Sequence, residues 1–382
     1  MFTNREGLNI DGVVSTLSRV VNHRTTLPLA LGLSLEPLLA RWAPALLRAL
    51  SQNETAAGLL RFAAGHAGLR RPAWIAAVLT SAWALSGWLT HKSTNNWVED
   101  PTWDFDSEIV LVTGGSSGIG AGVAREFLRR NPRTAVVVVD IAAALTWEVP
   151  AAADGARVHF YQCDVADAAA VRAMADRVRD EVGHPTVLFN NAGVARGSPI
   201  LTAPPEDFEL VVRTNLLAQY YVTQQFLGDM VRRDHGHIVY SGSLSSVIAG
   251  PSIGPYSSTK AGLSAMHDAL QLELKFMYDA PRVRQTLGIF GFIRTPMVGA
   301  ATKGGSFAVP FLEVETVAEA IVDSVYSTYS STIYLPGAAG FSAGLRGAPT
   351  WMLTNLRFGF GAGLAKLRMP AFGEQIRKIT QR

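Results

Sequence analysis

The chain has 382 residues, enough for one large α/β domain of about 250 residues and an additional segment. Its formal net charge is +3 and only 17% of its residues are charged, which argues against a nucleic-acid-binding surface. A single cysteine, Cys163, excludes an intramolecular disulfide and suits a reducing compartment. Hydrophobic residues make up 48% of the chain, a high share for a soluble protein, and the excess lies mostly before residue 100.

The first hundred residues are predicted to be helical. Residues 1–26 lack the basic and then apolar pattern of a cleavable signal peptide. Residues 27–50 are apolar but interrupted by three prolines, so we expect helical pieces on a membrane surface or against the rest of the protein. Residues 55–69 are expected to form a further short amphipathic helix. The polar stretch 95–103, which contains proline and tryptophan, is expected to be a linker.

Residues 72–90 form the best candidate for a membrane segment. They contain no charged residue, and as a helix they would extend about 28 Å, close to the roughly 30 Å thickness of a bilayer's hydrocarbon core. Trp74 and Trp88 lie near the two ends, where interfacial tryptophans are common. A buried core helix or a dimer-interface helix remains the alternative. A hairpin with residues 27–50 is as compatible as a single span, and flanking basic residues on both sides leave the orientation open.

A glycine-rich turn follows the first strand of the predicted α/β domain. The aliphatic run 109–112 is typical of a strand buried on both faces, and residues 121–130 read as a helix. A strand, a glycine turn and a helix in succession place a diphosphate against free backbone N–H groups at the helix N-terminus. The expected contacts are Gly114, Ser116, Ser117, Gly118, Ile119 and Gly120.

A second apolar strand, residues 135–139, ends at Asp140. An acidic residue about twenty positions past the glycine turn is suited to bind a ribose 2′-hydroxyl. Asp140 would also repel a 2′-phosphate, and the next residue, Ile141, offers no positive charge to attract one. The sequence therefore predicts NAD as the cofactor rather than NADP.

The turn 113–120, Thr-Gly-Gly-Ser-Ser-Gly-Ile-Gly, resembles the nucleotide-binding motif of the short-chain dehydrogenase/reductase family. Further motifs of that family arrive in order. After the expected strand 157–161, Asp164 and Val165 are similar to the pair that contacts adenine; a plain turn at the strand end is the alternative for Asp164. After the strand 186–190, the residues Asn191, Ala192 and Gly193 resemble the family's Asn-Asn-Ala-Gly motif on the adenosine side of the cofactor.

The catalytic motifs come next. Residues 205–235 read as one long helix, in which Asn215 resembles the asparagine that the family uses in a proton relay. Tyr256 and Lys260 are four residues apart and share one face of the next helix, 256–274. Ser243 precedes Tyr256 by thirteen residues, the family's spacing for its catalytic serine, although Ser241, Ser245 and Ser246 are rival candidates. The lysine ammonium and the nicotinamide charge are expected to lower the pKa of Tyr256 from about 10.

The last core segments follow. The strand 284–290 leads to Ile293 and Thr295, which are similar to the family's nicotinamide-carboxamide contacts, although Phe290 replaces the usual proline. Residues 299–309, rich in glycine and alanine, are predicted to form a mobile lid. A helix at 316–326 and a strand at 331–335 are expected to complete the domain. The apolar and basic tail 337–382 is expected to lie on a lipid surface, over the opening of the substrate site or at a dimer interface.

The resemblance implies a doubly wound parallel sheet (Rossmann-type α/β) at residues 106–336, after an N-terminal helical extension at 1–105. The expected activity is NAD-dependent interconversion of a lipophilic alcohol, such as a steroid, retinoid or long-chain lipid, and its carbonyl. An NAD(P)H-dependent ketolipid reductase and a non-catalytic membrane or lipid-droplet scaffold are the alternatives. We expect association with endoplasmic reticulum or lipid droplets, a catalytic domain that faces the cytosol, no metal and no nucleic-acid partner; a homodimer stays open.

Overall fold

The computed structural model describes residues 4–6, 10–149, 157–297, 310–345 and 347–366. The chain divides into two compact units. The helical unit comprises residues 12–93, and the α/β unit comprises residues 1–11 and 94–382. The predicted lid at 299–309 and the end of the tail lie outside the described residues.

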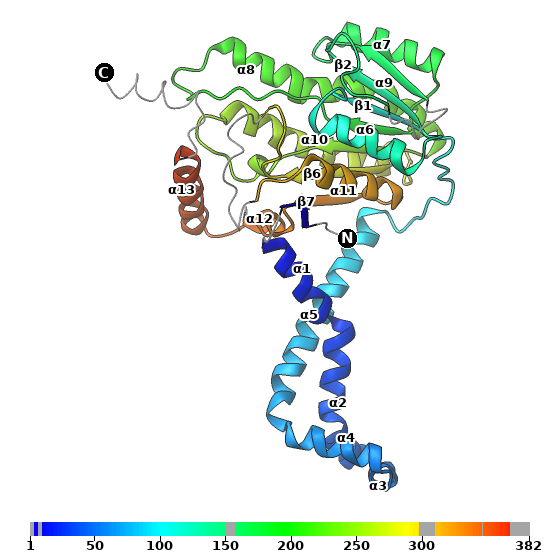
Figure 1. Ribbon diagram of the computed structural model, residues 1–382, viewed down its shortest axis with the longest axis vertical. Helices are drawn as coiled ribbons and strands as arrows, with labels where there is room; N and C mark the ends of the chain where they lie inside the picture. The colour runs from blue at the N-terminus through cyan, green and yellow to red at the C-terminus, as the bar shows by residue number, and fades with distance from the viewer. Residues whose placement is uncertain (1–3, 7–9, 150–156, 298–309, 346, 367–382) are drawn as a thin grey trace, which may run out of the picture. The chain divides into compact units, whose positions relative to one another are not determined.

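The α/β unit is built on one seven-stranded parallel sheet with the order β3-β2-β1-β4-β5-β6-β7 (Figure 1). The strands are β1 (Ile109–Thr113), β2 (Ala135–Asp140), β3 (Val158–Gln162), β4 (Val187–Asn190), β5 (His237–Ser241), β6 (Arg284–Phe290) and β7 (Ser331–Leu335). The strand order reverses between β1 and β4, so the connections leaving these two strands diverge and open a crevice at their carboxyl ends. This is the predicted doubly wound sheet.

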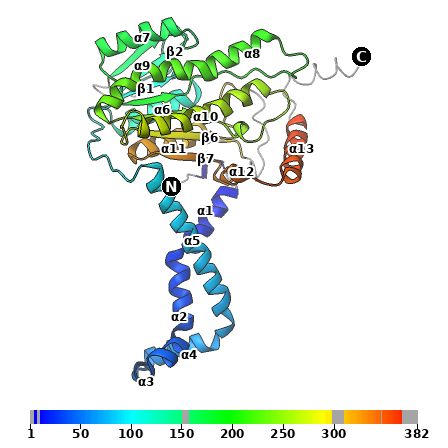
Figure 2. The ribbon, with the colours of Figure 1, turned by 180° about the vertical axis from the view of Figure 1, so that it is seen from behind.

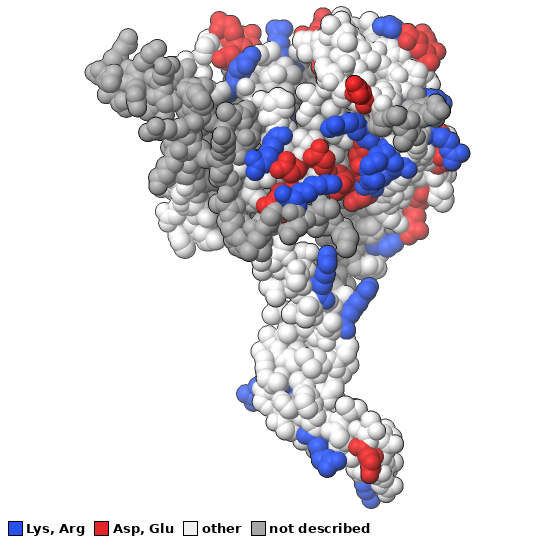
Figure 3. Space-filling model, viewed as in Figure 1, with Lys and Arg blue, Asp and Glu red and all other residues white. Residues whose placement is uncertain are grey.

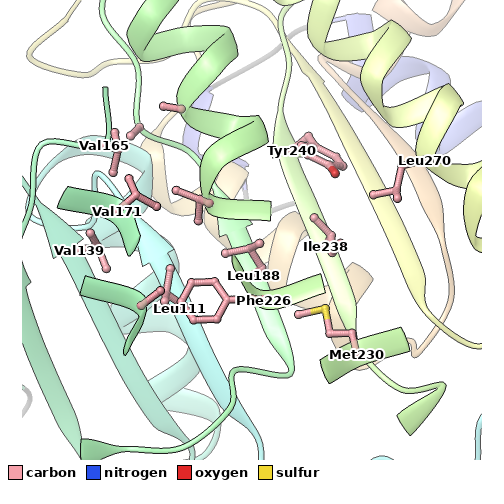
Figure 4. Close-up of a cluster of buried hydrophobic side chains, with 14 of the residues drawn as sticks. Leu111, Val139, Val165, Val171, Leu188, Phe226, Met230, Ile238, Tyr240 and Leu270 are labelled. Atoms are coloured by element: carbon pink, nitrogen blue, oxygen red, sulfur yellow. The ribbon is translucent and has the colours of Figure 1, made fainter. Parts of the chain in front are cut away.

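Two layers of helices cover the sheet. Helices α6 (Gly118–Arg130) and α11 (Val314–Tyr326) pack together on one face (Figure 1), and α7 (Ala168–Glu181), α9 (Ala218–Arg233) and α10 (Gly254–Phe276) cover the other (Figure 2). The strand residues alternate between the two cores as the pleat requires: Leu111 packs under α7 and α9 (Figure 4), whereas Val110 and Val112 pack under α6. Helices cover both faces of the sheet, which explains why β1 and β2 are continuous apolar runs.

The long helix expected at 205–235 is divided into three parts. Helix α8 (Pro205–Val212) passes into a π-helical turn (Arg213–Leu217), and α9 then ends at Arg233, because Asp234 adopts the left-handed conformation with φ of 46°. A π turn has a wider hydrogen-bond spacing than the surrounding helix and does not change the apolar periodicity enough to be seen in the sequence. A 3₁₀ turn, Leu244–Ser246, precedes α10.

The segment 95–103, which the sequence suggests is a linker, packs against the α/β unit. The Asn95 side chain is buried and exchanges two hydrogen bonds with the backbone of Ser330, at 2.6 and 3.3 Å. The guanidinium of Arg284, at the start of β6, donates to the carbonyl oxygens of Asn95 and Val98. After β7 the chain forms a 3₁₀ turn (Gly337–Gly340), α12 (Phe341–Leu345) and α13 (Thr350–Lys366).

The helical unit contains α2 (His23–Trp42), α3 (Pro44–Ser51), α4 (Glu54–Gly65) and α5 (Arg70–Thr94); α1 (Ile10–Val20) begins in the α/β unit. The expected break at each proline of residues 27–50 is wrong for two of them, since Pro28 and Pro37 lie inside α2 and only Pro44 starts a new helix. Between these two prolines, small and aliphatic residues of α2 pack against α5. The contacting residues are Ala30, Leu33, Ala73 and Ala77.

Helices α2 and α5 run antiparallel and are joined by polar contacts along their length. The hydroxyl groups of Thr26 and Thr80 are 2.7 Å apart, and the indole Nε1–H of Trp74 donates to the Ser34 hydroxyl at 2.8 Å. Within the described residues, the segment Ala67–Thr94 is the one helix long and apolar enough to cross a membrane, and 11% of its apolar window is buried. The predicted segment 72–90 is therefore the middle of α5.

Candidate active site

The glycine turn between β1 and α6 is the first part of the site. Gly118 has φ of 53°, a conformation that favours glycine, and a Cβ at Gly120 would collide with the carbonyl group of Gly114. Asn191, after β4, secures the turn by donating its amide N–H groups to the carbonyl oxygens of Thr113 and Gly114 at 3.0 and 3.2 Å. The first backbone N–H groups of α6 have no partner within the helix, which is the geometry that suits an anion.

Asp140 lies beside this turn, at the end of β2. One carboxylate oxygen accepts the backbone N–H of Ser116 at 2.9 Å, and the other accepts the N–H of Ala142 at 3.0 Å. The carboxylate is half-buried and firmly held, while the neighbouring Ile141 side chain is exposed. The structure therefore brings the predicted acid to the predicted diphosphate loop.

Asp164 and Val165 follow β3. The Asp164 carboxylate accepts the backbone N–H of Ala166 at 3.0 Å, as a turn residue at the end of a strand does. Asp164 is exposed, whereas the Val165 side chain is buried in the core under α7. The turn role of Asp164 is thus visible, and the adenine contact stays a prediction.

A cavity opens at the carboxyl ends of β1, β4, β5 and β6, and it contains most of the predicted site. It is lined by the predicted residues Gly114, Ser117, Gly118, Ile119, Asn191, Ala192, Gly193, Ser243, Tyr256, Lys260, Ile293 and Thr295. Ser116, Gly120, Asp140, Ile141, Asp164, Val165 and Asn215 are not among the residues that line it. Sequence reasoning missed the lining residues Gly242, Phe290, Gly291, Pro296 and Met297, of which Gly242 and Pro296 directly adjoin predicted ones.

Ser243, Tyr256 and Lys260 meet in this cavity. Ser243 follows β5, and its hydroxyl hydrogen-bonds to the phenol of Tyr256 and accepts the backbone N–H of Ser245 at 3.2 Å. Tyr256 lies in the first turn of α10, and Lys260 one turn later, with its ammonium 5.6 Å from the centre of the tyrosine ring. Ser243 therefore has the contact with Tyr256 that the spacing predicts, and its rival Ser245 supports Ser243 by donating its own hydroxyl at 3.0 Å.

The surrounding protein shifts the pKa values of the tyrosine and the lysine. Removal of the phenol from water raises the pKa of Tyr256 above its ordinary value of 10.0, and the hydrogen bond from Ser243 opposes this shift. Burial of the ammonium lowers the pKa of Lys260 to about 8. The protein's own groups thus do not lower the pKa of Tyr256 as the sequence led us to expect, because desolvation outweighs the other influences on the phenol.

Asn215 lies in the π-helical turn and is fully buried. Its carbonyl oxygen accepts the backbone N–H of Val194 at 2.7 Å, and its amide donates to the Val194 carbonyl oxygen at 2.9 Å. A Cβ at Gly193 would lie only 3.2 Å from the Asn215 oxygen, so glycine permits this close pairing. Asn215 therefore fixes the strand exit after β4 to the helix that precedes α9.

Phe290, which replaces the usual proline, lies buried at the end of β6. Its ring occupies the space that a Cβ at Gly288 would need, so a glycine two residues earlier makes room for it. Beyond it, the side chain of Thr295 lies 3.4 Å from the position that a Cβ at Gly118 would take. The segment after β6 thus faces the glycine turn across the cavity.

Two residues beyond the cavity, Thr146 and Trp147, were also missed. Both hydrogen-bond to the glycine turn, and their sequence positions, in an irregular segment after β2, carry no motif by which they could have been found.

Several known proteins resemble part of this chain. The sequence model of short chain dehydrogenases matches residues 108–304. The chain is 36% identical over 207 residues to dehydrogenase RED2 of Cochliobolus heterostrophus, covering 53% of this chain and 75% of that protein. It is 30% identical over 232 residues to epidermal retinol dehydrogenase 2 of Homo sapiens, covering 60% and 74%. A solved structure described as a short chain dehydrogenase/reductase family protein matches with a TM-score of 0.52 and 25% identity, over 61% of this chain and 97% of that one.

Proposed function

The chain belongs to the short-chain dehydrogenase/reductase family of oxidoreductases that act on CH–OH groups, and we propose that it oxidises a lipophilic alcohol with NAD⁺, using Tyr256 as the acid–base group. One observation carries this proposal. Ser243, Tyr256 and Lys260 line the same cavity as the glycine turn, so a proton-transfer group and a dinucleotide site adjoin each other.

In the proposed reaction, Tyr256 removes the proton of the substrate hydroxyl while Ser243 donates a hydrogen bond to the developing oxyanion. NAD⁺ bound at the site supplies the acceptor for the hydride that leaves the alcohol carbon. Lys260 holds the nicotinamide ribose, and its positive charge favours the phenolate form of Tyr256. Asn215, whose side chain pairs with the backbone of Val194 after β4, holds a water that passes the proton toward solvent.

The residues of the chain fit a dinucleotide. The glycine turn offers the N–H groups of a helix start to the diphosphate, and Asp140 stands beside it, where an adenosine ribose would lie. A 2′-phosphate would bring negative charge against this carboxylate. Replacing Asp140 with alanine is therefore expected to lower the ratio of kcat/KM with NAD to kcat/KM with NADP by about tenfold or more. Asp176→Asn, on the exposed side of α7, is the matched control; an unchanged ratio in Asp140→Ala would contradict the assignment.

Apolar side chains near the cavity favour a lipophilic substrate. Met297 lines the cavity and is 51% exposed. The exposed Ile200 lies against Gly254 at the start of α10, two residues before Tyr256, and Leu201 beside it is also exposed. Such side chains would contact the hydrocarbon part of a steroid, a retinoid or a long-chain alcohol, and one relative is named as a retinol dehydrogenase.

The experiment is an assay of the detergent-solubilised full chain with NAD⁺ and alcohols of graded hydrophobicity. We expect NADH formation that increases with substrate hydrophobicity, a fall in kcat of about a thousandfold or more in Tyr256→Phe, and unchanged NADH binding in that variant. Tyr278→Phe is the matched control, because the exposed Tyr278 lies after α10 and its hydroxyl donates to the carboxylate of Glu273. Near-normal turnover in Tyr256→Phe would refute the acid–base role. A wild-type protein that is inactive with every alcohol and ketone would favour the alternative of a non-catalytic scaffold.

We also propose that the helical unit embeds in lipid as a hairpin, with α2 entering and α5 returning. Between Arg24 and Arg41, Glu36 is the single charged residue of α2, and α5 has none between Arg71 and His91. On the face seen in Figure 3, the surface of this unit is largely uncharged, with charged side chains, mostly basic, toward its ends, whereas the α/β unit carries interspersed charges of both signs.

The exposed side chains of the helical unit support the same proposal. Large apolar residues on α5, such as Ile75, Val78, Leu79 and Trp83, are more than half exposed. The contact between α2 and α5 combines three alanines and Leu33 with the hydroxyl pair of Thr26 and Thr80, and such small and polar contacts are typical of helices that pair inside a bilayer. Lipid is the solvent that would cover these side chains, and an endoplasmic reticulum membrane or a lipid-droplet surface would supply it.

Site-specific labelling distinguishes a hairpin from a single span. In a Cys163→Ser background, single cysteines at Asn4, Gln52 and Asn96 are treated with a membrane-impermeant maleimide in sealed vesicles. A hairpin places positions 4 and 96 on the same side, so both label or both are protected, whatever the result at position 52. Opposite labelling of positions 4 and 96 would indicate that α5 alone crosses the membrane.

A further inference from the structure

The segment that follows β2 folds back onto the glycine turn. The indole Nε1–H of Trp147 donates a hydrogen bond of 2.9 Å to the carbonyl oxygen of Gly115, and the hydroxyl of Thr146 donates to the carbonyl oxygen of Ser116. Asp140 accepts the N–H of Ser116 at 2.9 Å. The peptide group between Gly115 and Ser116 is therefore held at both ends, by Trp147 on its oxygen and by Asp140 on its nitrogen.

This peptide group has little freedom to move away from the sheet. A Cβ at Gly115 would lie 2.9 Å from the Val138 side chain and 3.1 Å from the carbonyl oxygen of Val112, so the turn is pressed against β1 and β2. Trp147 is itself anchored, because its half-buried ring packs with Leu145 against the core beneath α6 and α11. Trp147 thus attaches the glycine turn to that core.

We propose that Trp147, supported by Thr146, is a positioning residue for the dinucleotide, and this proposal rests on the function proposed above. By fixing the Gly115–Ser116 peptide, it sets the spacing between the Asp140 carboxylate and the N–H groups at the start of α6. An adenosine ribose and a diphosphate must contact these two groups together. A site held in its binding geometry before the ligand arrives avoids the entropic cost of ordering a glycine-rich turn, so the affinity is higher.

The same clamp bears on the choice of cofactor. A ribose with a free 2′-hydroxyl fits beside a fixed carboxylate as a hydrogen-bond donor. A 2′-phosphate would require the turn and the carboxylate to move apart, and Trp147 and Thr146 oppose that movement. Loosening the clamp is therefore expected to weaken NAD binding more than NADP binding, whereas a general loss of structure would weaken both alike.

Two conservative variants of the full chain test the proposal. Trp147→Phe keeps an aromatic ring and removes the N–H, and Thr146→Val keeps the branched shape and removes the hydroxyl. Trp103→Phe is the matched control, because the buried Trp103 Nε1 has no hydrogen-bond partner to lose within the described part of the chain. Trp103 also contacts His235 and His237 at the start of β5, and the site lies at the opposite, carboxyl ends of the strands.

The expected result for Trp147→Phe is a fivefold to tenfold rise in the Kd of NADH, measured by the fluorescence of the bound nicotinamide. The KM for NAD should rise by the same factor, kcat at saturating NAD should stay within twofold of wild type, and the ratio of kcat/KM with NAD to that with NADP should fall. Thr146→Val should change each value in the same direction, and Trp103→Phe should change none.

An unchanged Kd in Trp147→Phe, or equal losses with NAD and NADP, would overturn the positioning role while leaving the proposed function intact. A wild-type protein that binds neither NADH nor NADPH would overturn the proposed function and this inference together.

Discussion

The ammonium group of Lys260 donates a hydrogen bond of 2.7 Å to the carbonyl oxygen of Ser241, the last residue of β5. Lys260 is almost fully buried, and the carbonyl oxygen holds its charge in the cavity one helical turn from Tyr256. This contact links the helix that carries the tyrosine to the strand that precedes Ser243. The Lys260 ammonium and the Tyr256 ring are therefore held at a fixed separation.

Replacing Lys260 with methionine, which has a similar shape and no charge, is expected to reduce kcat/KM by about a hundredfold or more, because the phenolate loses its cationic neighbour. Lys275→Met, on the exposed end of the same helix, is the matched control. Burial lowers the pKa of Lys260 to about 8, so in wild type the ammonium loses its charge as the pH rises through that value. Affinity for NADH should therefore decrease between pH 7 and pH 9, and Lys260→Met should show no such step in a fluorescence titration.

Replacing Asn215 with alanine is expected to destabilise the α/β unit, because the N–H and carbonyl groups of Val194 would lose their partners in a partly buried position. A loss of about 2 kcal/mol is the expected size, which corresponds to roughly 4 °C or more in the thermal midpoint. Gln224→Ala, on the exposed side of α9, is the control and should leave the midpoint unchanged. If Asn215→Ala melted at the wild-type temperature, the pairing with Val194 would contribute nothing to stability.

His235 should make stability depend on pH. Burial alone would lower its pKa, but hydrogen bonds and charges from Glu108 and Asp100 raise the pKa above its ordinary value of 6.5. Its Nδ1 is 2.8 Å from Asp100; the His235 side chain is 13% exposed, and the two carboxylates are almost inaccessible to solvent. The stabilisation is complete below pH 6.5 and is lost as the pH rises through the raised pKa of the folded protein.

The corresponding variant is His235→Gln. At pH 6 we expect it to lower the thermal midpoint by about 6 °C, from a loss of roughly 3 kcal/mol. The loss at pH 9 should be smaller, because wild-type His235 is more often neutral there. His184→Gln removes a histidine whose nearest carboxylate, Asp229, is 3.7 Å away, and should show neither effect. An equal loss for His235→Gln at pH 6 and pH 9 would contradict the charged state assigned to His235.

Much of the sheet, and many of the residues at the carboxyl ends of its strands, could be predicted from local patterns. The runs at 109–112 and 135–139 are uniformly apolar because both faces of the sheet are covered, and Asp140 is conspicuous as the polar residue that ends the second run. Tyr256 and Lys260 share a helix face, so their proximity follows from helical geometry alone. These features are encoded by neighbouring residues.

Contacts between distant segments could not be predicted in this way. Trp147 bonds to Gly115, thirty-two residues earlier, through a segment with no regular pattern. The sequence around Arg284 has no pattern from which its complete burial could be predicted. That burial depends on hydrogen bonds to the carbonyl oxygens of residues 95, 98, 281 and 328. The pKa of Tyr256 likewise depends on how much protein surrounds the phenol, which spacing along the chain does not contain.

The π-helical turn at Arg213–Leu217 limits how the length of this region can vary. Such a turn holds one residue more than a regular α-helix would use over the same distance. Deleting one residue there would relax the backbone into an uninterrupted helix, but it would rotate Asn215 away from the segment after β4. Related chains should therefore tolerate insertions and deletions in the loop before α8 and in the loop after α9. They should conserve the number of residues within this turn.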